Sequence, residues 1–417
     1  MHPEKIPTQK DKIMVLLAAF LGWMFDGLEM GIFPLVARPA LQEMQTTVGA
    51  IDDRFVGHWM GIVTATFLLG AAAGGFVFGW LGDKIGRVRA MSMAIMCYAV
   101  FTGLVYFAQE PWHLAALRFI AALGMGGEWA LGVALVMEVW PEKNRPMLAG
   151  VIGAAANIGF ALIAIVGMSF AVTQETWRYV VLIGVVPAAL TFVVRLFVPE
   201  SEKWKVSAAA KPTQPLREIL ASPRLIKPTL LAILFASVAL IGTWGSVQWL
   251  PLWADQMVGP DLPKAKAYTQ ALSAVGSILG CLLGAWLGAA IGRRWAYFLL
   301  CLASLGSCFW LFSGIDSYGL PFLTLTFIVG AVTASFYGWL PLYLPELFPT
   351  RVRATAQGLA FNTGRILAAF GAIYMGALMQ TFDGSYAKAG TVVTLVYVIG
   401  MVVIWFAPET KGKPLPA

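Results

Sequence analysis

Charged residues are scarce in this chain of 417 residues. They make up 12% of the sequence, compared with about 25% in typical globular proteins, whereas hydrophobic residues make up 59%. So few polar side chains could not cover the surface of a soluble fold, and the composition therefore predicts a protein that lies in lipid. The net charge of +7 does not indicate nucleic-acid binding, because the basic residues form short clusters between apolar runs and no continuous stripe.

Cysteine is also rare. Cys97, Cys281, Cys301 and Cys308 lie in apolar runs without the spacing of metal ligands, which favours small buried side chains over a metal site. No nucleophile–base set and no phosphate-binding loop stands out, because the glycines of GMGG at 124–127 fall in an apolar span, where close helix packing explains them. We therefore expect neither an enzyme nor a cofactor or metal site.

Long apolar runs dominate the rest of the chain. A bilayer core about 30 Å thick requires about 20 helical residues, and runs of that length recur in two sets of six. They lie near 13–36, 57–80, 90–108, 112–137, 147–170 and 178–198, then near 227–250, 268–290, 295–313, 320–344, 354–379 and 388–406. We expect an all-α membrane protein with six-helix bundles at 1–198 and 227–417 and a basic cytoplasmic linker at 199–226.

The positions of Lys and Arg predict the orientation in the membrane. With the N-terminus in the cytoplasm, twenty of the 29 basic residues fall on the cytoplasmic side, six fall outside and three lie within spans. The positive-inside rule then places both termini in the cytoplasm.

The two halves share short repeats. WLGDKIGR at 80–87 recurs as WLGAAIGR at 286–293, and EVWPEKNR at 138–145 recurs as ELFPTRVR at 346–353. GWLGDKIGRVR at 79–89 resembles the loop signature of the major facilitator superfamily, and RFIAALGMGGEW at 118–129 resembles its fourth-helix motif. The resemblance implies the major facilitator fold, with twelve transmembrane helices and substrate bound between the two halves.

Finer motifs narrow the resemblance. DGLE at 26–29 and FPTRVRATAQGLAFNTGR at 348–365 are similar to the sialate and monocarboxylate proton symporters, with the aromatic-acid proton symporters as close relatives. The lactate-transporting branch carries a His and an Asp on the seventh helix, whereas this chain has Trp244 and Gln248 there. That difference makes lactate itself a less secure substrate.

Two carboxylates, Asp26 and Glu29, stand at i and i+3 in the first span, about 5–6 Å apart at Cβ. Two ionised carboxylates so close in a poor solvent repel each other, so at least one should be protonated for part of the cycle. The resemblance implies that Glu29 and Arg118 are the first-helix acid and fourth-helix Arg of related symporters. Counting helical rise puts both in the outer half, where they could pair.

We expect protonation of Glu29 to release Arg118, with Asp26 and Glu128 nearer the midplane able to share the proton. The alternative is that one acid merely pairs with a buried Arg to hold helices together.

An arginine near the bilayer centre suggests an anionic substrate. Arg365 lies about 21 Å along its helix from Arg351, and its guanidinium suits a carboxylate. The alternative is a structural bond to a neighbour such as Asn362. The expected substrate site combines these two with residues on helices four, seven and ten, which line the cavity in the resembled fold: Trp129, Trp244, Gln248 and Tyr337.

Charged loop residues are expected to gate the cytoplasmic side. In the first half they are Asp83, Arg87, Arg89 and Glu138, and in the second half Arg293 can meet Glu346. Exposed ion pairs are individually worth about 0–1 kcal/mol, which suits a gate that must open.

These features favour a monomeric inner-membrane symporter that imports a small organic anion with protons. The anion would be a monocarboxylate, a sialate-like acid or an aromatic acid, and the expected partners are this anion, protons and the bilayer. A proton-driven exporter of metabolites or drugs, a sugar porter and a non-transporting nutrient receptor remain as alternatives.

Overall fold

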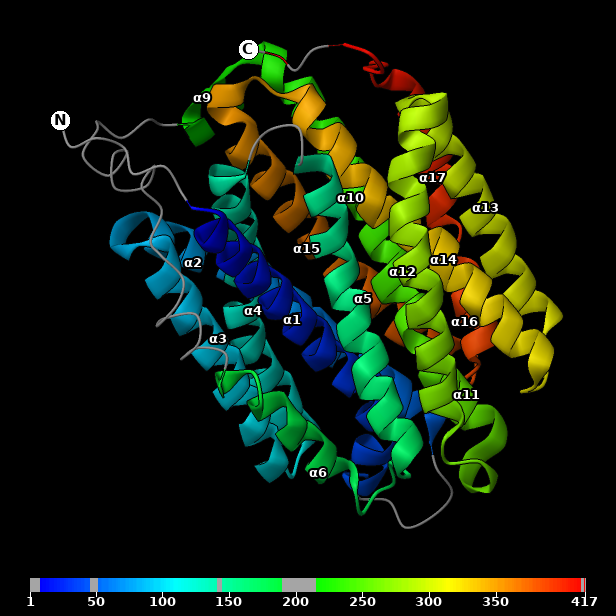
Figure 1. Ribbon diagram of the computed structural model, residues 1–417. Coiled ribbons are helices and arrows are strands. Elements are labelled where there is room, and N and C mark those ends of the chain that lie inside the picture. The colour runs from blue at the N-terminus through cyan, green and yellow to red at the C-terminus, as the bar shows by residue number, and fades with distance from the viewer. Residues whose placement is uncertain (1–7, 46–51, 141–144, 190–214, 414–415, 417) are drawn as a thin grey trace.

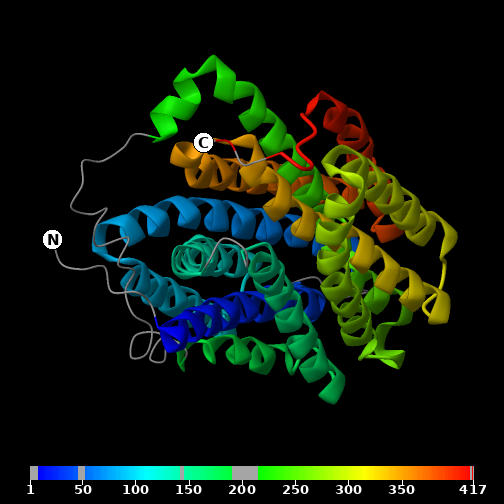
Figure 2. The same cartoon turned by 45° about the horizontal axis from the view of Figure 1, so that its top comes forward.

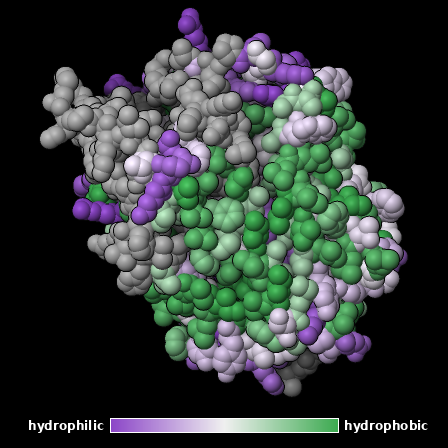
Figure 3. All heavy atoms as spheres, viewed as in Figure 1, coloured by the Kyte–Doolittle hydropathy of each residue, from purple (hydrophilic) through white to green (hydrophobic). Residues whose placement is uncertain are grey.

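The computed structural model describes residues 8–45, 52–140, 145–189, 215–413 and 416, and every regular element in these ranges is helical. Eight helical stretches of this described part are long and apolar enough to cross a membrane. Figure 3 shows a broad hydrophobic band over the side of the molecule, with hydrophilic residues gathered at its two ends. Large apolar side chains such as Trp310 and Phe370 are exposed, as lipid-facing residues are.

The first half of the chain forms helices at the positions of the expected spans. They are α1 (Gln9–Glu43), α2 (Asp53–Ile85), α3 (Arg87–Leu104), α4 (Pro111–Val139), α5 (Arg145–Ser169) and α6 (Trp177–Leu182). A 3-10 turn at Ile183–Val185 continues the sixth span, and residues 190–198 lie outside the described ranges. These helices lie together in Figures 1 and 2, with α1 packed against both α4 and α5.

The second half follows the same plan with two interruptions. Its helices are α9 (Pro215–Ala221), α10 (Pro223–Gly245), α11 (Leu250–Val258), α12 (Ala265–Ile291), α13 (Arg293–Gly314), α14 (Leu320–Tyr343), α15 (Thr350–Thr381), α16 (Tyr386–Val393) and α17 (Val396–Val403). The seventh span is broken between α10 and α11 by a 3-10 turn at Val247–Trp249, and the twelfth divides into α16 and α17. The expected linker contains α9, and α10 begins a few residues before 227.

The repeated octapeptide has the same structural task in both halves. Gly86 and Gly292 occupy its seventh position, with φ of 110° and 98°, and they end α2 and α12. A side chain is rarely tolerated at such φ values, so glycine allows the sharp turn into the next helix.

Close approach of helices depends on other glycines and joins the two halves. A Cβ added to Gly27 would lie 1.9 Å from the carbonyl oxygen of Ala156, so α1 and α5 touch backbone to backbone. The halves meet along α2 and α15 and along α5 and α12. Across the second of these seams, Asn157 Nδ2 lies 3.5 Å from Cys281 Sγ.

Candidate functional site

Glu29 of α1 is completely buried and forms an ion pair with Arg118 of α4, whose side chain is 4% exposed. Arg118 Nη1 donates to Glu29 Oε1, so the pairing suggested by the depth count is present. The hydroxyl of Thr102 on α3 donates to the same oxygen at 2.9 Å. Glu29 Oε2 accepts no hydrogen bond from the described residues. Sequence reasoning missed Thr102, because a threonine in an apolar helix gives no signal of its partner.

The guanidinium of Arg118 lies between two aromatic rings. Its Cζ is 4.9 Å from the ring centre of Phe33 and 4.7 Å from that of Phe67. The ring faces offer the cation a partly negative surface, which compensates for some of the lost hydration. The ring of Phe67 in turn contacts Trp244, with ring centres 5.2 Å apart.

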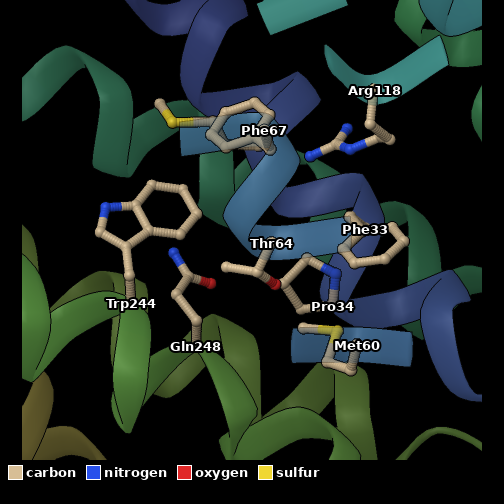
Figure 4. Close-up of a pocket in the computed structure, with 9 residues that line it drawn as sticks. Phe33, Pro34, Met60, Thr64, Phe67, Arg118, Trp244 and Gln248 are labelled. Atoms are coloured by element: carbon tan, nitrogen blue, oxygen red, sulfur yellow. The ribbon is translucent and has the colours of Figure 1, made fainter. Parts of the chain in front are cut away.

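A small pocket opens beside Arg118, as Figure 4 shows. Both halves of the chain line it, with Trp244 and Gln248 coming from the second half. It is lined by Met30, Phe33, Pro34, Met60, Thr64, Phe67, Arg118, Trp244 and Gln248. The cavity measures about 10 Å³, which is room for one water molecule and far too little for an organic acid. A substrate could therefore occupy this place only after the halves move apart.

The break in the seventh span places Trp244 and Gln248 at this pocket. α10 ends at Gly245, Ser246 leaves the helical conformation with φ −136°, and the chain then makes the 3-10 turn. Trp249 Nε1 donates to the carbonyl oxygen of Trp244 at 3.1 Å across the break. Trp244 and Gln248, which were expected to bind substrate, thus face Arg118, a residue of the expected proton-coupling site.

Two of the other expected substrate residues, Arg365 and Asn362, lie together. Arg365 Nη1 lies 3.3 Å from Asn362 Oδ1 and 3.5 Å from the carbonyl oxygen of Ala71 on α2, so it reaches across to the first half. The structural bond to Asn362, given above as the alternative to substrate binding, is thus present. Asp26 is buried and near enough for its charge to attract Arg365. Tyr337 of α14 donates to Thr243 at 3.0 Å.

An unpredicted cluster of charged residues joins the halves at the end opposite the start of α1. Arg38 binds Asp53 of α2 and reaches Asp255 of α11, with Nε 3.2 Å from Oδ2. Lys266 of α12 lies 3.2 Å from Asp255 Oδ1, and Gln256 donates to Asp53 at 2.8 Å. The side chains of the two cations are less than a tenth exposed. The count of basic residues above includes Arg38 and Lys266 only as two of the six expected on the outer side.

A second ion pair at that end is exposed. Arg54 Nη2 lies 2.6 Å from Asp383 Oδ1, with side chains 58% and 77% exposed. Because these contacts and those of Arg38 bind the first half to the second, the molecule is closed at this end, which the sequence predicts to be the outer one.

The predicted pair of Arg293 and Glu346 is present at the other end, with Nη2 2.7 Å from Oε1. Both residues belong to the second half, so this pair does not itself connect the two halves. Glu346 also accepts a hydrogen bond from Thr410 at 2.5 Å. Whether the pair acts in gating stays a prediction.

Glu409 caps the start of α13 close to that pair. Its carboxylate accepts from the backbone N–H groups of Arg293 and Arg294 at 3.0 and 3.1 Å. Burial alone would raise the pKa of Glu409, but hydrogen bonds from these two groups and from the backbone of Lys411 and Thr410 outweigh it and lower the pKa.

Several predicted residues stay untested. The side chains of Asp83, Arg87, Glu128, Trp129 and Glu138 lie outside the described part of the structure. Arg89 is exposed in the first turn of α3, as a loop-facing charge would be.

Known proteins match the chain over nearly its whole length. A protein of Haemophilus influenzae assigned to metabolite transport is 31% identical, over 96% of this chain and 97% of that protein. The cis,cis-muconate transport protein of Acinetobacter baylyi is 27% identical, covering 96% and 95%. The sialic acid transporter NanX of Escherichia coli is 26% identical, covering 91% and 92%.

The fold has close counterparts among solved structures. A partially occluded inward-open structure of the xylose transporter XylE from E. coli aligns with a TM-score of 0.75 at 18% identity, over 97% of this chain and 99% of that one. A family model described as Major Facilitator Superfamily matches residues 15–372. The chain therefore belongs to the major facilitator superfamily and is a multi-pass membrane transporter, not an enzyme.

Proposed function

We propose that this protein imports a small organic anion together with protons across the inner membrane by alternating access. The observation that carries the proposal is the fully buried pair of Glu29 and Arg118 at the wall of a pocket that both halves line. An ionisable pair at membrane depth is costly, and its usual reason is a proton or ion pathway.

The hydrogen bonds at Glu29 suggest where the proton is held. Arg118 and Thr102 both donate to Oε1, whereas Oε2 has no donor among the described residues. A proton can add at Oε2 without first displacing either donor. Neutral Glu29 then loses most of its attraction for Arg118, because charge–charge attraction is strong in so dry a place.

Arg118 released in this way can bind the carboxylate of the substrate. Its guanidinium suits a carboxylate with two parallel hydrogen bonds, and the rings of Phe33, Phe67 and Trp244 suit a flat apolar body attached to it. The names of the relatives support an organic acid, since they include transporters of cis,cis-muconate, gentisate and sialic acid.

A second arginine supports an anionic substrate on its way to the cytoplasm. Asp26 attracts Arg365 in this conformation, with Asn362 alongside. We infer that a substrate carboxylate replaces Asp26 at Arg365 as it moves inward. Asp26 can then take up a proton, which would make it a second site for coupling.

Alternating access requires the buried charged cluster of Arg38, Asp53, Asp255 and Lys266, here called the outer cluster, to open. Arg38 holds Asp53 and Asp255 from opposite halves, directly beyond the pocket along α1. We infer that these contacts break as the outer side opens, enlarging the pocket to the roughly 300 Å³ or more that small-molecule sites require.

The decisive experiment is uptake into proteoliposomes under an inward proton gradient. Labelled cis,cis-muconate, gentisate, benzoate, sialate, lactate and glucose would be compared, with Glu29→Gln beside the wild type. Gradient-driven uptake of one acid that loses its pH dependence in Glu29→Gln is expected. Preference for glucose would favour a sugar porter, proton-for-substrate exchange an exporter, and binding without flux a receptor.

A further inference from the structure

Thr102 departs from the hydrogen bonding of four other threonines in the long apolar helices of this chain. Intramembrane threonines commonly donate to the carbonyl oxygen four residues earlier in their own helix. That bond is made by Thr229, Thr243, Thr269 and Thr333. Thr102 instead gives its hydroxyl to the carboxylate of Glu29, at 2.9 Å and in a site where Thr102 is 1% exposed.

Packing holds the side chain of Thr102 in this orientation. Its Cγ2 methyl faces Gly184 so closely that a Cβ added there would lie 2.4 Å from it. A β-branched side chain has few χ1 positions, so fixing the methyl against Gly184 also fixes the hydroxyl. The donor is therefore preset toward Glu29 by the contact of α3 with the sixth span.

We propose that Thr102 is a positioning residue that sets the pH at which Glu29 takes up its proton. The inference rests on the proposed function, because it assumes that Glu29 carries a coupled proton. A hydrogen bond donated to an ionised carboxylate stabilises that form more than the neutral acid. Thr102 thus delays protonation of Glu29, and it keeps Oε1 in place after Arg118 has left.

Other titratable groups lie on α1 and on the helices around it. Arg118 of α4 contacts Glu29 directly, and Asp26 lies one turn earlier on α1. Further groups stand on the elements packed against α1, namely His58 of α2, Arg178 of α6, Asp255 of α11 and Lys266 of α12. Tyr98 stands on α3, the helix that carries Thr102. Arg178 and Asp255 are engaged by Glu43 and Lys266. Of this set, Arg118 is the charged group that bonds to Oε1 of Glu29 together with Thr102.

The test is the pH dependence of thermal stability of the purified full-length protein, without substrate. Thr102→Val keeps the shape and removes the donor, and Thr102→Ser keeps the donor. We expect the Glu29-dependent midpoint to rise by about one pH unit in Thr102→Val, a typical value for one hydrogen bond to a charged group. Thr102→Ser should restore the wild-type midpoint. Thr102→Ala serves in the same way if the valine variant does not fold.

A matched background isolates the effect. In Glu29→Gln, Thr102→Val should leave the pH profile unchanged, because there is no carboxylate to tune. The inference about Thr102 would be overturned if the midpoint did not shift in Thr102→Val and Thr102→Ala, or if the shift also appeared in the Glu29→Gln background. Either result would leave the proposed proton site at Glu29 standing. If Glu29→Gln leaves the wild-type profile unchanged, the proposed proton site fails and the inference fails with it. The same shift is expected in the pH profile of uptake for any acid that the wild type imports.

Discussion

Replacing Arg118 by Met would leave Glu29 as a buried carboxylate, with Thr102 as its remaining donor among the described residues. Breaking a buried ion pair by removing one partner typically costs about 3–5 kcal/mol, because the other charge stays in the low-dielectric interior. Methionine can still pack between the rings of Phe33 and Phe67, so little of this loss comes from a cavity. We therefore expect Arg118→Met to lose about 3–5 kcal/mol of stability near pH 8.

The loss should depend on pH in a definite direction. In Arg118→Met the buried, unpaired carboxylate favours its neutral form, so the folded chain binds a proton more readily than the unfolded chain. Stability of the variant then falls as pH rises and recovers as pH falls. Glu29→Gln removes the charge permanently, so the double variant should regain most of the loss at pH 8.

Thermal melting of the four proteins at pH 5 and pH 8 measures both effects. Arg118→Met should melt several degrees below the wild type at pH 8. This difference in melting temperature should be smaller at pH 5, and it should also be smaller for the double variant. If the difference is equal at both pH values and Glu29→Gln does not reduce it, the buried charge of Glu29 is not its cause. The pair would then be structural packing.

Three further predictions concern other parts of the molecule. Asp255→Asn should speed hydrogen exchange in α11 and in the end of α1 near Arg38, because it weakens the buried cluster. Arg54→Gln, in an exposed pair worth about 0–1 kcal/mol, should not. Glu409→Gln should cost about 1 kcal/mol or less at pH 7. Because the pKa of Glu409 is lowered, its carboxylate stabilises the fold at pH values above the pKa of the unfolded chain. This stabilisation is lost as the pH falls through the pKa of the folded chain, so the melting temperatures of the wild type and Glu409→Gln should converge in acid. Gly27→Ala should cost roughly 1–3 kcal/mol or more in melting assays, whereas Gly358→Ala, with open space at its Cβ, should not.

The sequence predicted best what depends on local pattern. Helix positions follow from the length of apolar runs, and the repeated octapeptide lies at equivalent turns of the two halves, at Gly86 and Gly292. The pairing of Glu29 with Arg118 rested on the family resemblance together with depth, because the bilayer turns residue number into height along each helix.

Contacts between helices at equal depth could not be predicted in this way. Depth alone does not tell which face of α3 meets α1, so Thr102 gave no signal. The break in the seventh span is also invisible to hydropathy, because the composition of Trp244 to Leu250, which holds no charged residue, is the same whether or not the helix continues. Its effect is to turn Trp244 and Gln248 toward Arg118, whereas Asn362 lies beside Arg365.

The outer cluster is suited to a gate because it is ionic. Apolar packing of the same size would hold the halves together strongly, since each buried aliphatic side chain contributes about 1.5–3 kcal/mol. For a buried ion pair, the loss of hydration nearly cancels the attraction between charges, so its net contribution is small although its geometry is specific. Arg38, Asp53 and Asp255 can thus define the closed state without making it much more stable than the open one. The proposed carrier needs that near balance, because a ligand shifts a conformational equilibrium only by its difference in affinity between the two states.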